Sequence, residues 1–388
     1  MNRDDILARA RRMADWIADN IGDDPHWEML LGTVLYCAER DPKRHFPAPQ
    51  WNQAFVMMSM LSAHRVFGDD KYRRAAAAIA RQLRSLQIFD PFLPESYGAI
   101  REQSAMTASC YVRDALSGAW GYLEYYRATG NVEFLKRAVL WGEWFLKHGM
   151  DETGWPWWGV AIDPVQNTEG MELLPMHNEL QGAFHGGCLN FFYQLHLTTE
   201  DRKWVGGFFE RIADHFCARI RQEDGFFRSV ERATGKVPPQ DPQNGLHRCN
   251  DDFGTLGLLC AHRIYPKPEY LHTVDRFIRA ATAQQRSDGS FEDSCAAIPV
   301  VLNVIHESEG LLTSNLPPQL EEKALKALFS RQYPADEVPA LAGGLDETGR
   351  NFACSRSVAY ALLYLLKVYG GDRRFLRGGV PEIGAEWM

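Results

Sequence analysis

The stretch "VFGDDKYRRA", residues Val66–Ala75, joins the end of one predicted helix to the start of the next. Gly68 suits the left-handed conformation in which many helices end, and the acidic residues after it favour a new helix amino terminus. The arrangement recurs in "ATGNVEFLKRA" at Gly130 and in "LTTEDRKWVGG" at Thr199. Weaker copies lie at Pro266, Pro317 and Gly371. The copies are 51 to 69 residues apart, room for two helices and two loops, so the sequence predicts six helical hairpins.

The two helices of each hairpin differ in character. Those after the tight turns, such as "DKYRRAAAAIARQLRSL", carry Arg and Lys on one face and are amphipathic. Those before them, such as "DDFGTLGLLCAHR", are apolar on most faces and rich in small residues, which lets crowded helices approach closely. We therefore predict an all-α (α/α)6 barrel, a single domain over residues 1–388. Its inner helices are expected near residues 51, 106, 178, 250, 297 and 352, and helix 4–20 is expected to supply the sixth outer helix.

Composition narrows the classes of function. The 388 residues are 45% hydrophobic with a net charge of −8, and no Lys/Arg-rich run is present, which argues against a nucleic-acid partner. The charged amino terminus is unlike a signal peptide, and no apolar run is long enough to span a membrane, so a cytoplasmic location and no membrane partner are expected. Eight scattered cysteines lack metal-ligand spacing, and phosphate-binding or dinucleotide motifs are missing. We expect no metal and no cofactor.

The connections at the other end of the hairpins are long and irregular. They cover residues 89–105, 150–177, 222–249, 287–296 and 332–351. Long connections without secondary structure inside a compact domain are usually functional. The site is therefore expected at this end, where most of the unusual side chains lie.

Two adjacent carboxylates open the fourth inner helix, in "HRCNDDFGTLGLLCAHR". Asn250 suffices as the helix cap, which leaves Asp251 and Asp252 as candidates for an acid at the rim of a cleft. A purely capping role for these carboxylates is the alternative, because Asp is favoured at helix starts. His247 and Arg248 precede them and are candidates for binding a substrate hydroxyl or carboxylate.

A third carboxylate, Asp114 in "YVRDALSGAW", is expected inside an inner helix, with Arg113 on another face. Asp114 should then either bond a neighbouring helix end or point into the central cavity. His177 is expected at the mouth of the third inner helix, where it could act as an acid or base. Glu102 and Glu179 are further candidates for binding substrate.

Three tryptophans, Trp155, Trp157 and Trp158, lie together in the Gly/Pro loop "TGWPWWGV". They cannot form a helix stripe, so we predict stacking platforms for sugar rings; packing of the loop onto its own barrel is the alternative. Arg101, Arg113 and Arg248 are candidates for pairing with a uronate carboxylate. The expected partner is an oligosaccharide or another small molecule.

The hairpin pattern and the segment "RDALSGAWGYLEYYRATGNVEFLKRAVLWGEWFLKH" resemble the six-hairpin glycosidase superfamily. The segment "MHNELQGAFHGGCLNFFYQLHLTTEDRKW" is similar to a stretch of sugar 2-epimerases and glucuronyl C5-epimerases. However, "WNQAF" at Trp51 lacks the Arg that 2-epimerases place after this Trp. The resemblance implies a carbohydrate-active enzyme, and we favour an unsaturated uronyl hydrolase with Asp114 and Asp251 or Asp252 in its site.

Other functions remain open from the sequence. A sugar epimerase or a polysaccharide lyase would use the same fold. The segment "RFIRAATAQQRSDGSFED" resembles a repeat of terpenoid cyclases, in which case Asp252 of "CNDD" would be the acid. A non-catalytic sugar-binding protein would use the acidic residues only as helix caps.

Overall fold

The computed structural model describes residues 1–22, 32, 35–39, 45–104, 107–161, 174–176, 179–180, 182–228, 230–237, 252–312, 316–335, 339–349 and 352–372. For the short strands within 35–47 and 174–180, and for the first residues of α6 and α9, it describes the backbone alone. The chain divides into two compact units, residues 1–83 with 278–377 and residues 84–277 with 378–388. The single-domain organisation expected for residues 1–388 stays a prediction. None of the helices in the described ranges combines the length and apolar character that crossing a membrane requires.

The first unit contains the helices from both ends of the chain. They are α1 (Arg3–Ala18), α2 (Gln50–Phe67), most of α3 (Asp70–Leu86), α11 (Ala297–Ser308), α12 (Leu320–Ser330), the short η4 (Pro339–Leu341) and α13 (Ser355–Val368). Helix α13 packs against both α2 and α11, while α1 packs against α2 and α13, the outer position predicted for helix 4–20. A small antiparallel sheet of order β2-β1-β8 leads directly into α13. Its strands are β1 (Leu35–Glu39), β2 (His45–Pro47) and β8 (Phe352–Cys354).

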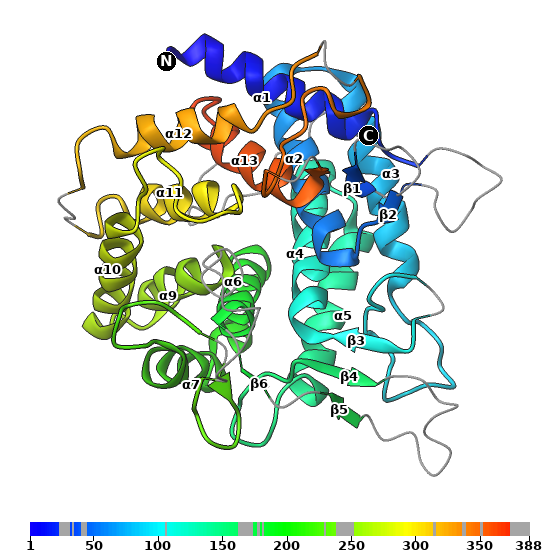
Figure 1. Ribbon diagram of the computed structural model, residues 1–388. Helices are drawn as coiled ribbons and strands as arrows, with labels where there is room; N and C mark the ends of the chain where they lie inside the picture. The colour runs from blue at the N-terminus through cyan, green and yellow to red at the C-terminus, as the bar shows by residue number, and fades with distance from the viewer. Residues whose placement is uncertain are drawn as a thin grey trace. The chain divides into compact units, whose positions relative to one another are not determined.

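The second unit contains the middle of the chain (Figure 1). Its helices are α4 (Val112–Thr129), α5 (Val132–His148), α6 (Gly182–Thr199), η2 (Arg202–Val205), α7 (Gly207–His215), the π-helical η3 (Phe216–Ile220), α9 (Asp252–Ile264) and most of α10 (Pro268–Ala283). Helix α6 packs against both α4 and α9, and α5 packs against α4. In each unit, therefore, three of the predicted inner helices lie side by side.

Glycines allow α6 and α9 to approach closely. A Cβ atom on Gly257 would lie 2.7 Å from the Cα atom and 2.8 Å from the carbonyl oxygen of Gly186. Real Cβ atoms do not tolerate such contacts, so no side chain fits at Gly257 without moving a helix. The prediction that small residues serve crowded inner helices is confirmed at this crossing.

The tight turns use left-handed residues, as the sequence predicts. Gly68 (φ 67°) ends α2 and donates its backbone N–H to the carbonyl of His64, and Gly130 (φ 71°) ends α4 in the same way. No atom lies within 4 Å of a Cβ built on Gly68, so backbone conformation rather than space makes glycine suitable there. In the third turn Glu200 takes the left-handed conformation (φ 59°) instead of a glycine.

Three of the tight turns share a histidine cap. In each, the imidazole Nδ1 near the end of an inner helix lies 3.1–3.2 Å from the carbonyl oxygen of the residue five positions further on. The pairs are His64 with Asp69, His196 with Asp201, and His262 with Lys267. Because a carbonyl oxygen can only accept, Nδ1 must carry the proton in all three. These histidines therefore stabilise turns at the end of the hairpins away from the long loops.

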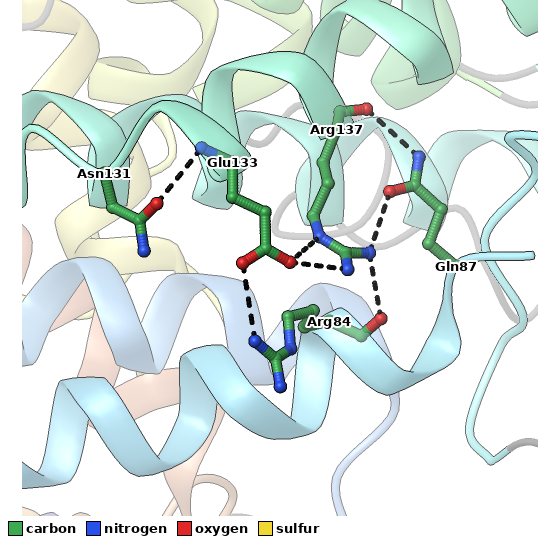
Figure 2. Close-up of polar contacts among 5 residues, drawn as sticks. All are labelled: Arg84, Gln87, Asn131, Glu133 and Arg137. Carbon is green, nitrogen blue, oxygen red and sulfur yellow. Dashed lines mark hydrogen bonds and ion pairs between the residues drawn. The ribbon is translucent and has the colours of Figure 1, made fainter. Parts of the chain in front are cut away.

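Polar contacts fasten the end of α3 to α5 (Figure 2). Asn131 caps α5 by accepting the backbone N–H of Glu133 at 3.0 Å. The Glu133 carboxylate accepts two hydrogen bonds from Arg137, at 2.7 and 2.9 Å, and one from Arg84 at 3.4 Å. Gln87 donates to the Arg137 carbonyl at 3.0 Å. The hydrogen bonds and charge of Arg137 hold the pKa of Glu133 below its ordinary value despite some burial.

Candidate active site

A three-stranded antiparallel sheet in the second unit joins two segments that the sequence analysis singled out. Its order is β3 (Ser109–Tyr111), β4 (Gly159–Ala161), β5 (Leu174–Met176). Strand β3 runs directly into α4, and β4 follows the tryptophan loop. The Val112 N–H extends this pairing by donating to the carbonyl oxygen of Trp158 at 2.9 Å. The loop "TGWPWWGV" therefore lies against the first turn of α4.

Asp114 lies in this first turn of α4 and is bound by its sequence neighbour. Arg113 Nη1 donates to Asp114 Oδ1 at 2.7 Å, and each side chain is 16% exposed. Two expectations were wrong: Asp114 is not in the helix interior, and Arg113 does reach it. Residues 109–111 are extended in β3, so the helix begins later than its apolar pattern predicts, and a long Arg side chain can fold back in a first turn. Within the described residues, Asp114 Oδ2 has no hydrogen-bond partner.

Glu102 belongs to the same neighbourhood. Its backbone N–H donates to the carbonyl of Ser109, at the start of β3, at 3.2 Å. Burial raises the pKa of Tyr111, and the negative charges of Glu102 and Asp114 raise it further. Both carboxylates are therefore near enough to act on one phenol. The structure brings together four predicted residues, Glu102, Arg113, Asp114 and Trp158.

The three tryptophans of the loop have different environments. Trp155 is only 8% exposed, and its ring meets the His215 imidazole edge-on with 4.9 Å between centroids. Trp157 and Trp158 each keep part of their surface exposed. The alternative of loop packing thus describes Trp155, while Trp157 and Trp158 retain surface on which a sugar ring could stack.

An ion pair that was not predicted from the sequence holds this loop. Arg232 Nη1 lies 2.5 Å from Asp151 Oδ2, and Nη2 donates to the carbonyl of Pro156. Asp151 Oδ1 accepts the backbone N–H groups of Thr153 and Trp155 at 2.9 and 3.0 Å. Burial alone would raise the pKa of Asp151, but these hydrogen bonds and the charge of Arg232 hold it below its ordinary value. The signal in the sequence was "DETGW", an Asp followed by a glycine turn.

A second small sheet carries the backbone of Glu179. Strand β6 (Glu179–Leu180) pairs with β7 (Val230–Glu231), so Glu179 lies opposite Glu231 in the register. Arg232 directly follows β7. The chain before α6 therefore lies beside the segment whose Arg232 holds the tryptophan loop. The structure describes only the backbone of Glu179.

Several predicted site residues fall outside the described residues. They are Asp251, His177, His247 and Arg248. Asp252 is the first residue of α9, as predicted for the start of the fourth inner helix, and only its backbone is described. In the described ranges, no three His, Cys, Asp or Glu side chains gather closely enough to hold a metal ion.

The first unit holds a buried polar cluster that the sequence analysis also missed, at the start of α13. Arg356 pairs with Glu347, and both side chains are almost completely buried. The Glu347 carboxylate also accepts the hydroxyls of Ser294 and Ser357 at 3.2 and 3.0 Å. Its charge is thus fully compensated inside the protein, as buried ions require.

No protein-family model matches the sequence, and no curated protein matches it either. Solved structures do. Cellobiose 2-epimerase from Bacillus thermoamylovorans has a TM-score of 0.70 at 12% identity, covering 94% of this chain and 100% of its own. A family 76 α-mannanase from Bacteroides thetaiotaomicron has a TM-score of 0.67 at 12% identity, covering 94% of this chain and 96% of its own. Unsaturated glucuronyl hydrolase from a Bacillus species has a TM-score of 0.66 at 12% identity, covering 97% of this chain and 99% of its own.

At these identities the likeness establishes the fold. The chain has the (α/α)6 fold of six-hairpin glycosidases, and the predicted fold class is confirmed. Strands β3 and β6 precede the inner helices α4 and α6. Their partners β4 and β7 belong to the long loops, so these pairings hold long-loop segments at the amino-terminal ends of the two helices.

Proposed function

We propose that this protein is a carbohydrate-active enzyme, a glycoside hydrolase that acts on oligosaccharides containing uronic acids, unsaturated ones included. The observation that supports this most is the Val112–Trp158 hydrogen bond, because it puts partly exposed indole surface beside the Arg113–Asp114 pair. A sugar enzyme needs both a stacking surface and carboxylates. The structural neighbours act on sugars by their names, which favours the same class here.

In this proposal Asp114 touches the substrate. Its Oδ1 is held by Arg113, and its Oδ2 remains for a substrate hydroxyl or for the proton of an attacking water. Arg113 also supplies positive charge for a uronate carboxylate. Glycoside hydrolysis needs a second carboxyl group that protonates the leaving oxygen, and Asp251 or Asp252 is our candidate for it. Trp157 and Trp158 would stack on the ring, and His177, His247, Arg248, Glu102 and Glu179 remain candidates for binding substrate.

An adjacent pair of aspartates has a parallel among the neighbours. An α-1,6-mannanase from a Salegentibacter species, with a TM-score of 0.62 at 10% identity, is described as inactive after replacement of two consecutive aspartates by asparagine. The neighbour's aspartates are at positions 136 and 137 of its chain, so the parallel is one of residue type and not of position; it shows why adjacent aspartates are replaced together in the test. It does not favour mannose as the sugar, because the fold is shared by enzymes for several sugars.

The test is a screen of unsaturated uronyl disaccharides, uronides and neutral oligosaccharides. The screen compares the wild type with Asp114→Asn, with the double variant Asp251→Asn/Asp252→Asn, and with a matched control, Glu152→Gln. Glu152 is exposed in the tryptophan loop and makes none of the described side-chain bonds, so its neutralisation should leave turnover unchanged. The aspartate variants should lose at least a hundredfold in kcat, the scale of general acid or base catalysis. Full turnover by both aspartate variants would overturn the assignment.

Epimerisation is the second candidate, since a cellobiose 2-epimerase shares the fold over almost the whole chain. The two functions give different products from one reducing disaccharide. Hydrolysis yields two monosaccharides, whereas epimerisation yields an isomer of unchanged mass. Chromatography of the same reactions therefore separates them.

A further inference from the structure

The tryptophan loop contacts three arginines and a histidine, here called the Trp155 cluster: Arg211, His215, Arg219 and Arg232. The Arg219 guanidinium lies 5.2 Å from the Trp155 ring centroid, and the Arg232 guanidinium lies 4.3 Å from that of Trp157. A Cβ on Gly154 would be 3.4 Å from Arg211 Nε. Helix α7 and η3 supply three of the four residues, and β7 leads into the fourth.

Positive charge is in excess in the Trp155 cluster. Asp151 is already bound by Arg232. Asp214, next to His215 in sequence, is bound by Lys267 at 2.7 Å and by the Tyr270 hydroxyl at 2.8 Å. For Arg211 and Arg219, the described residues provide no carboxylate partner, and both side chains are exposed. Two guanidinium groups are therefore available to an anion from solution.

The cluster also has buried donors without acceptors. Trp155 Nε1 and Arg232 Nε are inaccessible to solvent, and neither has a hydrogen-bond partner among the described residues. Buried donors are nearly always satisfied, so these two mark the cluster as polar beneath its exposed guanidinium groups. The adjacent η3 is a π-helix, a rare conformation that occurs frequently at functional sites.

We propose that the Trp155 cluster binds a carboxylate of an acidic oligosaccharide, in a subsite separate from the reacting sugar. This inference rests on the proposed function and extends it. Trp157 connects the two places, since it contacts Arg232 on one side and precedes Trp158, which is bound to the start of α4. A chain with acidic groups on successive sugars could then contact Asp114 with one residue and the cluster with another. Guanidinium groups suit carboxylates because they donate two parallel hydrogen bonds.

The test measures binding rather than turnover, by titration calorimetry with α-1,4-tetragalacturonate and with neutral cellotetraose. The Asp114→Asn protein is the background, so that substrate is not consumed. Arg211→Ala/Arg219→Ala should weaken tetragalacturonate binding at least tenfold and leave cellotetraose binding unchanged. Arg202→Ala is the matched control, an exposed arginine on η2 at the tight-turn end of the same unit, and should change neither. Lysine at both positions should restore part of the affinity.

Three results would overturn the subsite: no binding of tetragalacturonate, equal affinity in the double variant, or equal affinity for the neutral sugar. Inorganic phosphate is the further probe, and competition by phosphate as strong as that of tetragalacturonate would mean a simple anion site instead. The outcome is independent of the reaction. If every aspartate variant kept full turnover, the proposed function would be overturned. A charge-dependent binding result would still stand. Thermal unfolding of each variant verifies that the fold is retained.

Discussion

Val112 donates its backbone N–H to the carbonyl oxygen of Trp158 at 2.9 Å, and this bond joins the start of an inner helix to the tryptophan loop. It continues the β3–β4 pairing, in which Tyr111 lies opposite Gly159. Gly159 suits this register, because a Cβ there would lie 2.8 Å from the Tyr111 ring. The position of the loop is thus set by backbone pairing, and its side chains are free to differ in role.

Substitutions of two neighbouring tryptophans should separate stability from binding. Trp155→Ala removes a buried ring and should lower the free energy of unfolding by about 3–5 kcal/mol. Trp158→Ala removes a partly exposed ring and should cost far less stability but weaken oligosaccharide binding. Urea unfolding and titration calorimetry measure the two effects. Equal loss of stability in both variants would contradict the distinction.

Gly257→Ala should destabilise the protein, because its Cβ would meet the backbone of Gly186. Overpacking of this kind costs about 1–3 kcal/mol. Gly206→Ala is the control, since Gly206 has a φ of −75° and its nearest neighbour would be 3.4 Å away. Chemical denaturation should show little change for Gly206→Ala. A neutral result for Gly257→Ala would mean that α6 and α9 pack less tightly than described.

The pH dependence of stability should include Asp151. Its pKa is lowered in the folded protein, so it contributes stability that is present above the unfolded pKa of about 4 and is lost as pH falls through the folded value. The difference in unfolding free energy between wild type and Asp151→Asn should therefore be large at pH 7 and shrink below pH ~4. Urea unfolding across this range measures it. A difference that stays constant would show that ionisation of Asp151 contributes nothing.

The inner helices could be predicted from sequence because small and apolar residues on most faces distinguish them from amphipathic outer helices. The inner helices expected to start near residues 51, 297 and 352 begin at Gln50, Ala297 and Ser355. The start expected near 106 lies at Val112, because the residues before it form β3. A strand of three residues has too few positions to show an alternating pattern.

The site was harder to predict than the fold, for physical reasons. Arg113 and Asp114 are adjacent in sequence, and adjacent residues do not face each other along a regular helix; their contact depends on the first turn. The Arg232–Asp151 pair joins residues 81 positions apart through their side chains, which no local pattern records. Asp114, Glu102 and the tryptophans were identified because their residue types are unusual for where they lie.

The buried pair Arg356–Glu347 should be structural rather than catalytic, and its variants can show this. Arg356→Met leaves an uncompensated buried carboxylate, so the free energy of unfolding should fall by about 3–5 kcal/mol. Arg356→Met/Glu347→Gln removes both charges while an amide can still bind Ser294 and Ser357, so part of that loss should be regained. Lys326→Met in the exposed Lys326–Glu322 pair is the control and should change stability by less than about 1 kcal/mol. Turnover should follow the folded fraction in every variant. A double variant that is stable but inactive would instead place this pair in the chemistry.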